Sequence, residues 1–329
     1  MNNRFENALQ LRVPIALAPM ALASGGALAA ACAKAGALGL VGGGYGELAW
    51  TQREYALACS QAAQSSDPSD LRRIGIGFIT WKLDQDASAL DWTLDQAHVP
   101  SAVMLSFGDA RSYAKRILAR GAHLICQVQT MAQVPQCLEA GAHIIVAQGA
   151  EAGGHGMNAL NGRSTLTFVP ELADWLANHA PQTVLLAAGG VADARTLAAV
   201  RLLGADGALV GSRLWATQES LAAAGAKAQA VATNGDGTAR SPVFDILRRK
   251  NWPAPYDFRA IRNDLHRQLE ADVEGLRAAP DAARALYDAG VSAQDFSRAH
   301  ATVGEAVGLI HDLPKADDVI QRMVQRLDS

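Results

Sequence analysis

Short apolar runs alternate with amphipathic segments along the first two thirds of the chain. Eight of these runs lack Asp, Glu, Lys and Arg, as strands buried in a parallel sheet do. They cover residues 13–18, 38–41, 74–79, 102–106, 123–127, 143–147, 184–188 and 207–210. The segments between them have helical patterns, most clearly at residues 48–63, 110–120 and 194–203. The pattern therefore predicts eight strands that alternate with helices.

A glycine closes the helical segment ahead of four of these strands. The glycines are Gly36, Gly121, Gly141 and Gly204. Glycine readily adopts the left-handed conformation that ends many helices, so each helix–glycine–strand pattern indicates a βαβ crossover. Eight such strands favour a (β/α)8 barrel, because an open doubly wound sheet predicts no particular count of eight.

The pattern changes after Val231. Residues 234–237 are rich in turn formers, and the two prolines within residues 251–255 exclude a regular helix there. Residues 257–299 then predict charged amphipathic helices. Residues 316–327 predict a last helix that lies back on the barrel wall.

These changes divide the chain into three expected parts. Residues 1–220 form the barrel, residues 221–303 form a helical region that covers the substrate, and residues 304–329 return to the barrel as a segment and a helix. The predicted fold class is α/β, a TIM barrel with an appended C-terminal helical cap. Residues 248–250 form a short basic cluster, which is interpreted as a solvated face rather than a phosphate site.

Composition excludes several classes of protein. Half of the residues are hydrophobic and the net charge is −3 without a basic stripe, so nucleic acid is not an expected partner. The four cysteines have neither disulfide-like nor metal-ligand spacing, so we expect reduced thiols and no metal. Residues 13–33 are uncharged, but prolines and a Ser-Gly-Gly sequence interrupt them, which argues against a signal peptide or membrane span. We expect a cytoplasmic protein with a small-molecule substrate, no membrane partner and an oligomeric state that the sequence leaves open.

Glycines follow the last two predicted strands. In a barrel all strands end at one mouth, where active sites lie. Gly189 and Gly190 follow the seventh strand, and Gly211 and Ser212 follow the eighth. Their backbone N–H groups and the serine hydroxyl are suitable donors for a phosphate. The chain has neither a P-loop nor a Rossmann fingerprint, so FMN is the expected cofactor; tight turns without a ligand are the alternative.

Polar side chains follow the fifth and sixth strands. Gln127 and Gln148 are neutral amides that could hydrogen-bond to the edge of a flavin ring. The sixth strand continues into a glycine-rich loop with one imidazole, His155, which can accept a proton at neutral pH or donate a hydrogen bond to an anion. An ordinary strand exit with a surface histidine is the alternative. The other seven histidines lie at strand starts or in helical and linker segments and are weaker candidates.

Together these motifs resemble the nitronate monooxygenase family, formerly called the 2-nitropropane dioxygenases. The resemblance covers nearly the whole chain, and its most specific segment is the Glu-Ala-Gly-Gly-His sequence at residues 151–155. The other matching segments are residues 14–20, 164–170, 188–191, 211–213, 243–245, 252–254, 259–263 and 304–312.

The resemblance implies an FMN-dependent oxidoreductase that oxidises alkyl nitronates with O₂ to a carbonyl compound and nitrite. His155 would be the catalytic residue, either as a base toward a neutral nitroalkane or as a partner of the nitronate anion. The residues that would hold FMN are Pro19, Met20, Ala21, Gly77, Gln127, Gln148, Gly153, Gly154, Gly189, Gly190, Gly211 and Ser212.

Two positions depart from the family pattern. Gly156 follows His155 where many relatives have an arginine, which removes a cation suited to holding a nitronate. Gly77 stands where relatives often have an asparagine, which removes a hydrogen bond to FMN.

Two other activities fit a barrel of this kind. One is an NAD(P)H-dependent quinone or enoyl-acyl-carrier-protein reductase, because those flavin enzymes have a similar glycine–histidine loop. The other is a lyase or isomerase that binds a sugar phosphate at the last two strand ends. It is less favoured because no lysine stands at a strand end; Lys82, the nearest, lies beyond Trp81.

Overall fold

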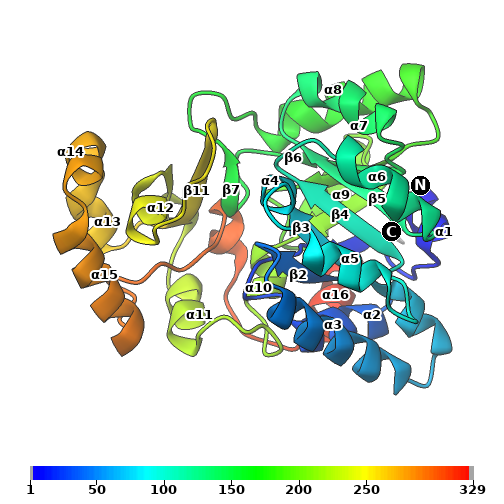
Figure 1. Cartoon of the computed structure of the whole chain (residues 1–329), viewed down its shortest axis with the longest axis horizontal. Coiled ribbons are helices and arrows are strands. Elements are labelled where there is room, and N and C mark those ends of the chain that lie inside the picture. Colours follow the sequence, from blue (N-terminus) through cyan, green and yellow to red (C-terminus); the bar gives the residue numbers. More distant parts are fainter. Residues whose placement is uncertain (1–2, 326–329) are drawn as a thin grey trace.

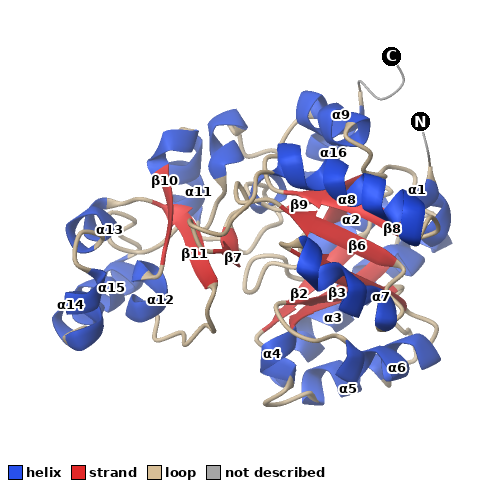
Figure 2. Cartoon of the chain, turned by 90° about the horizontal axis from the view of Figure 1, so that it is seen from above, coloured by secondary structure: helices blue, strands red, loops and turns tan. Residues whose placement is uncertain are grey.

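The computed structural model describes residues 3–325, and its larger part is a closed barrel (Figures 1 and 2). The barrel strands are β1 (Ile15–Leu17), β2 (Gly39–Gly44), β3 (Ile74–Ile79), β4 (Ala102–Ser106), β5 (His123–Val128), β6 (Ile144–Gln148), β8 (Val184–Ala188) and β9 (Gly207–Val210). They pair in parallel in the order β1-β9-β8-β6-β5-β4-β3-β2, and a parallel bridge between Ala16 and Leu38 closes the ring. The predicted (β/α)8 barrel is confirmed, and every predicted run overlaps its strand.

Helices surround the barrel on its outer side (Figure 2). They are α2 (Gly26–Lys34), α3 (Leu48–Ala63), α4 (Thr80–Leu83), α5 (Ser88–Leu94), α6 (Arg111–Ala119), α7 (Val134–Glu139), α8 (Thr165–His179), α9 (Ala194–Leu202) and α10 (Ser212–Trp215), with α1 (Arg4–Leu9) preceding β1. Along each strand, alternate residues pack outward against these helices or inward in the barrel interior. Leu40, Ile125 and Val146 belong to the inner core cluster. The four glycines predicted to close helices all have φ between +78° and +101°, which confirms that part of the pattern.

The last helix, α16 (Ala316–Val324), lies back on the barrel as predicted. It buries Ala316, Val319, Ile320 and Met323 in the same core cluster as the barrel helices, and it contacts α2 and α9. The end of the predicted helix, residues 326–327, lies outside the described residues. Among residues 3–325, no helix is long and apolar enough to cross a membrane.

The cap is not purely helical, which corrects the expectation from the sequence. Its helices are α11 (Ala224–Val231), α12 (Val243–Leu247), α13 (Asp264–Leu269), α14 (Val273–Ala278) and α15 (Asp281–Ala293). Beside them, β10 (Thr238–Ser241), β11 (Tyr256–Ile261) and β7 (Gly154–Met157) form an antiparallel sheet with β11 in the centre.

The prediction of helix was therefore wrong for residues 257–261. These residues bury Phe258, Ala260 and Ile261 and pair with β10 on one side and β7 on the other. The partner strand β7 lies about a hundred residues earlier in the chain, next to the barrel strand β6. A pairing over such a distance leaves no local signal, so the charged residues of this stretch resembled a helix. The sheet links the cap directly to the chain that leaves β6 (Figure 1).

Candidate active site

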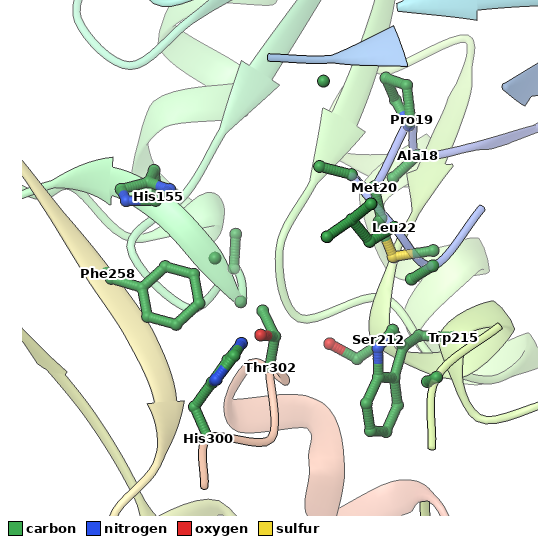
Figure 3. Close-up of a pocket in the computed structure, with 18 of the residues that line it drawn as sticks. Ala18, Pro19, Met20, Leu22, His155, Ser212, Trp215, Phe258, His300 and Thr302 are labelled. Atoms are coloured by element: carbon green, nitrogen blue, oxygen red, sulfur yellow. The ribbon is translucent and has the colours of Figure 1, made fainter. Parts of the chain in front are cut away.

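One cavity of about 820 Å³ lies between the C-terminal ends of the barrel strands and the cap (Figure 3). Its size falls within the range of small-molecule and cofactor sites, roughly 300–1,000 Å³. The structure brings every sequence-predicted site residue to its wall: Pro19, Met20, Ala21, Gly77, Gln127, Gln148, Gly153, Gly154, His155, Gly189, Gly190, Gly211 and Ser212. The barrel mouth forms one side of the cavity, and the cap sheet with the segment that precedes α16 forms the other.

The glycine loops after β8 and β9 leave backbone exposed to this cavity. Gly189 and Gly190 have φ of +96° and +78°, which an L side chain rarely adopts. A Cβ added at Gly190 would meet no atom within 4 Å, so this position opens onto free space. Ser212 begins α10, and its hydroxyl oxygen accepts a hydrogen bond of 2.8 Å from the backbone N–H of Gly304. Ser212 therefore links the segment around Gly304 to the end of β9. Its own hydroxyl proton remains free to be donated to a ligand.

Three glutamines connect the ends of β5 and β6 to the strand that bears His155. Gln127 and Gln129 both donate to Oε1 of Gln148, at 3.0 and 2.9 Å. Gln148 in turn donates from Nε2 to the backbone oxygen of His155 at 3.0 Å. Gln127 makes no hydrogen bond through its own Oε1 to the described residues, and it lies on the cavity wall. Gln129 was not foreseen; its Oε1 is buried without a partner among residues 3–325.

His155 is paired with Asp245 of the cap. Nε2 lies 3.0 Å from each carboxylate oxygen, and both side chains are buried. Because a carboxylate only accepts, Nε2 carries the imidazole proton and Nδ1 keeps its lone pair. Nδ1 makes no hydrogen bond to any residue between 3 and 325.

The surroundings of His155 keep it neutral. Burial lowers its pKa to about 4, and the hydrogen bond from Nε2 to Asp245 opposes that shift only in part. The ring of Trp252 stacks on the imidazole with centroids 3.4 Å apart, and Phe258 lies 4.8 Å away. At neutral pH the imidazole is therefore neutral and held in one orientation, with the lone pair of Nδ1 free, which is what a general base requires.

Two features near His155 differ from expectation. It stands on strand β7, opposite Phe258 of β11, and not in a loop; the four glycines nearby had favoured the loop. Asp245 lies in the family-matching segment 243–245, but the sequence alone assigns it no role, because 90 residues separate it from its partner. Nothing in the local sequence pairs these two residues, so only the three-dimensional fold identifies the dyad.

The structure explains both departures from the family pattern. A Cβ at Gly156 would lie 3.0 to 3.2 Å from the guanidinium of Arg240, so the space beside His155 is already filled by a cation from β10. Arg240 donates to the backbone oxygens of Ala150, Ala152, Gly154 and Asp257. At Gly77, a Cβ would come within 2.4 Å of Cγ of Pro19, so the proline ring occupies the room that an asparagine needs.

The basic cluster at residues 248–250 is not simply a solvated face, which corrects the interpretation from the sequence. All three residues line the cavity. Arg249 is exposed and pairs with Asp288, whereas Arg248 is largely buried with its guanidinium 4.5 Å from the centre of the Phe258 ring. His300, ranked among the weaker histidines, also lies on the cavity wall.

Comparisons with known proteins identify the family. A family model described as nitronate monooxygenase matches residues 82–326. The chain is 32% identical to a nitronate monooxygenase of Neurospora crassa, over 93% of this chain and 86% of the relative. It is 30% identical to the nitronate monooxygenase npaC of Metarhizium robertsii, over 98% and 94%.

Solved structures share the fold. FabK from Thermotoga maritima superimposes with a TM-score of 0.80 at 23% identity, covering 100% of this chain and 96% of that one. The nitroalkane oxidase from Streptomyces ansochromogenes gives a TM-score of 0.74 at 22% identity, covering 98% and 97%. At these identities the likeness concerns the barrel and its cap, not the chemistry.

Proposed function

The chain belongs to the nitronate monooxygenase family, and from that premise we propose that it is an FMN-dependent enzyme that oxidises alkyl nitronates with O₂ to a carbonyl compound and nitrite. The observation that carries the proposal is the His155–Asp245 pair, which presents an unprotonated Nδ1 on the wall of a glycine-lined cavity. The alkyl nitronate is the substrate class that the named relatives suggest.

The residues on the barrel side of the cavity fit FMN. Open backbone at Gly190 and Gly211, together with the Ser212 hydroxyl, offers neutral donors for a phosphate without a competing side chain. The free Oε1 of Gln127 is an acceptor for a ring N–H. Pro19, Met20, Ala21 and the short Gly77 would leave a flat surface for the ring system. Bound there, FMN supplies the two-electron redox chemistry that connects the substrate to O₂.

The chain's own contribution is proton transfer and the exclusion of water. A neutral nitroalkane carries an acidic C–H bond, and Nδ1 of His155 is placed to accept that proton and release the nitronate within the cavity. The resulting imidazolium is held by Asp245, whose carboxylate lies 3.0 Å from Nε2. Trp252, Phe107 and Phe258 surround the imidazole and keep bulk water from competing for the proton. A preformed nitronate does not need this step.

Anaerobic reduction of the bound flavin tests the proposal directly. We expect propyl-2-nitronate and 2-nitropropane to bleach the flavin absorbance, and NADH and NADPH to leave it unchanged. In His155→Ala, bleaching by 2-nitropropane should be lost while bleaching by the nitronate persists. His179→Ala is the matched control, because His179 is exposed on the outer helix α8.

Two results would overturn the proposal. A protein that retains no flavin after purification in the presence of FMN is not an FMN enzyme. Bleaching by NADH or NADPH, with no response to the nitronate, would instead assign a reductase to this barrel.

A further inference from the structure

A second imidazole, His300, stands on the cap side of the same cavity. Nδ1 of His300 lies 2.7 Å from the hydroxyl oxygen of Tyr287, which belongs to α15. The ring of Phe258 contacts both imidazoles, with centroids 4.8 Å from His155 and 5.8 Å from His300. Figure 3 shows the His300 ring directed into the cavity beside Thr302, on the same side as His155 and Phe258. One aromatic ring therefore separates the two imidazoles.

The hydrogen bond with Tyr287 decides which nitrogen of His300 carries the proton. Tyr287 is buried, and its hydroxyl has no other partner in the described part of the chain. A buried hydroxyl that donates to nothing costs about 1–3 kcal/mol, so the phenol proton is donated to Nδ1. Nδ1 is then the acceptor and Nε2 carries the hydrogen. Nε2 has no acceptor among residues 3–325, so this N–H is free to meet a ligand.

The positive charge of Arg248 acts on His300. The guanidinium of Arg248 lies over Phe258, and its Nη1 is buried without a hydrogen bond to any described residue. Its ion pair with Oδ1 of Asp245 is long, at 3.8 Å. Burial and the charge of Arg248 lower the pKa of His300 to about 3, so His300 is neutral beside the guanidinium. The cap wall thus combines one fixed N–H donor with one positive charge that is short of acceptors.

We propose that His300 and Arg248 form an oxyanion site on the cap wall, with Tyr287 as the positioning residue, and that this site holds the two oxygens of the substrate's nitro or nitronate group. The inference deepens the proposed function and rests on it. Arg240, the cation that fills the space beside Gly156, already donates to four backbone oxygens, so Arg248 at the end of α12 is the cation that can meet a ligand. The substrate carbon would then face the lone pair on Nδ1 of His155 while its oxygens face His300.

Binding of inorganic nitrate, a planar oxyanion that does not react, tests the site on the flavin-loaded protein. Isothermal titration calorimetry gives its dissociation constant for the wild type and for His300→Phe, His300→Gln, Arg248→Met and Tyr287→Phe. We expect His300→Phe and Arg248→Met each to weaken binding at least about tenfold, because each removes a charge-assisted contact. His300→Gln keeps an amide donor and should recover part of the loss, and Tyr287→Phe should weaken binding by a smaller factor.

Arg262→Met is the matched control, since it removes an exposed cation of the cap that is paired with Glu270 and does not line this cavity. It should bind nitrate as the wild type does. Thermal melting and flavin content establish that each variant is folded and loaded. Steady-state kinetics with propyl-2-nitronate should show the loss in His300→Phe mainly as a raised KM.

Nitrate that fails to bind the wild type, or binds His300→Phe and Arg248→Met as tightly as the wild type, would overturn the site. Failure of the proposed function would appear elsewhere, as absent flavin bleaching by the nitronate. The two results are therefore separable. Loss of nitronate bleaching with nitrate binding that still depends on residues 248 and 300 would keep the oxyanion site and reject the reaction.

Discussion

His155 and His300 present opposite hydrogen-bonding character to one cavity because each is fixed by a different partner. Asp245 accepts from Nε2 of His155 and leaves a lone pair at Nδ1, whereas Tyr287 donates to Nδ1 of His300 and leaves an N–H at Nε2. As a result, His155 can accept a proton and His300 can donate a hydrogen bond to an oxygen atom. Replacing a partner changes the chemistry without touching the histidine.

Asp245→Asn should separate the two kinds of substrate. An asparagine amide can donate to Nε2, which moves the imidazole proton to Nδ1 and removes the lone pair that faces the cavity. We expect kcat with neutral 2-nitropropane to fall roughly 10²-fold or more, the usual contribution of a general base. With preformed propyl-2-nitronate kcat should change little. Oxygen uptake with each substrate measures both, and equal losses with the two substrates would contradict the assignment.

Gly190→Ala should separate cofactor binding from backbone strain, because the chain offers a matched control. Gly190 and Gly121 share a φ of +78°, and an added Cβ would meet no atom within 4 Å at either position. Each alanine variant should therefore lose about 1 kcal/mol of unfolding free energy in the flavin-free protein. Only Gly190 borders the cavity, so only its variant should bind FMN at least about tenfold more weakly. Quenching of FMN fluorescence gives the affinity; equal affinities would show that this loop does not hold the cofactor.

The barrel strands could be predicted from the sequence, whereas strand β7 and its partners in the cap could not. The barrel strands were predictable because each is a short apolar run, and four of them also follow a helix that ends at a glycine, so these signals are local. The residues at the strand ends followed from that topology, since all parallel strands of a barrel open at one mouth. The pairing of β7 with β11 and of His155 with Asp245 depends on contacts across about 90 residues or more, and the composition of β7 itself favours a loop.

Arg240 holds the segment that carries His155, and its removal should destabilise the protein. Its guanidinium donates to four backbone oxygens, three of them in residues 150–154, and Arg240→Met removes all four hydrogen bonds; only the oxygen of Ala150 also accepts from another side chain, Arg259. We expect a loss of roughly 2–4 kcal/mol in the free energy of unfolding in urea. Arg262→Met, which removes an exposed pair with Glu270, should stay within about 0.5 kcal/mol of the wild type. Comparable losses of unfolding free energy in the two variants would show that the hydrogen bonds of Arg240 do not stabilise this segment.

The barrel and the cap share three chain passages, so they should gain or lose stability together. The chain enters the cap sheet at β7, leaves the barrel again after α10, and returns past Gly304 to α16. At the return, the N–H of Gly304 donates to Ser212 and the N–H of Glu305 donates to the backbone oxygen of Glu151, which joins cap, β7 segment and β9 at one point. These passages enclose the cavity. Protonation of its buried histidines should therefore change the free energy of unfolding of the whole molecule.

Stability should therefore fall as the pH is lowered through the range in which histidine titrates. Burial lowers the pKa of His155 to about 4 and of His300 to about 3, and it also lowers the pKa of His98, His143 and His266. In the unfolded chain these groups titrate near 6.5, so below that pH the unfolded state binds more protons than the folded state. The stabilisation is complete above pH 6.5 and is lost as the pH falls toward these lowered values.

Thermal melting between pH 7.5 and pH 5, above the range where most carboxylates titrate, measures this effect. Between pH 6.5 and pH 5 a single histidine held neutral, such as His155, accounts for about 2 kcal/mol of lost stability. His300→Gln removes one such group and should give a shallower decline in Tm than the wild type. His179→Gln, at an exposed position on α8, should follow the wild-type curve. A Tm that stays constant over this range would mean that the histidines of the cavity are protonated in the folded protein as readily as in the unfolded chain. The assignment of His155 as a neutral base would then be wrong.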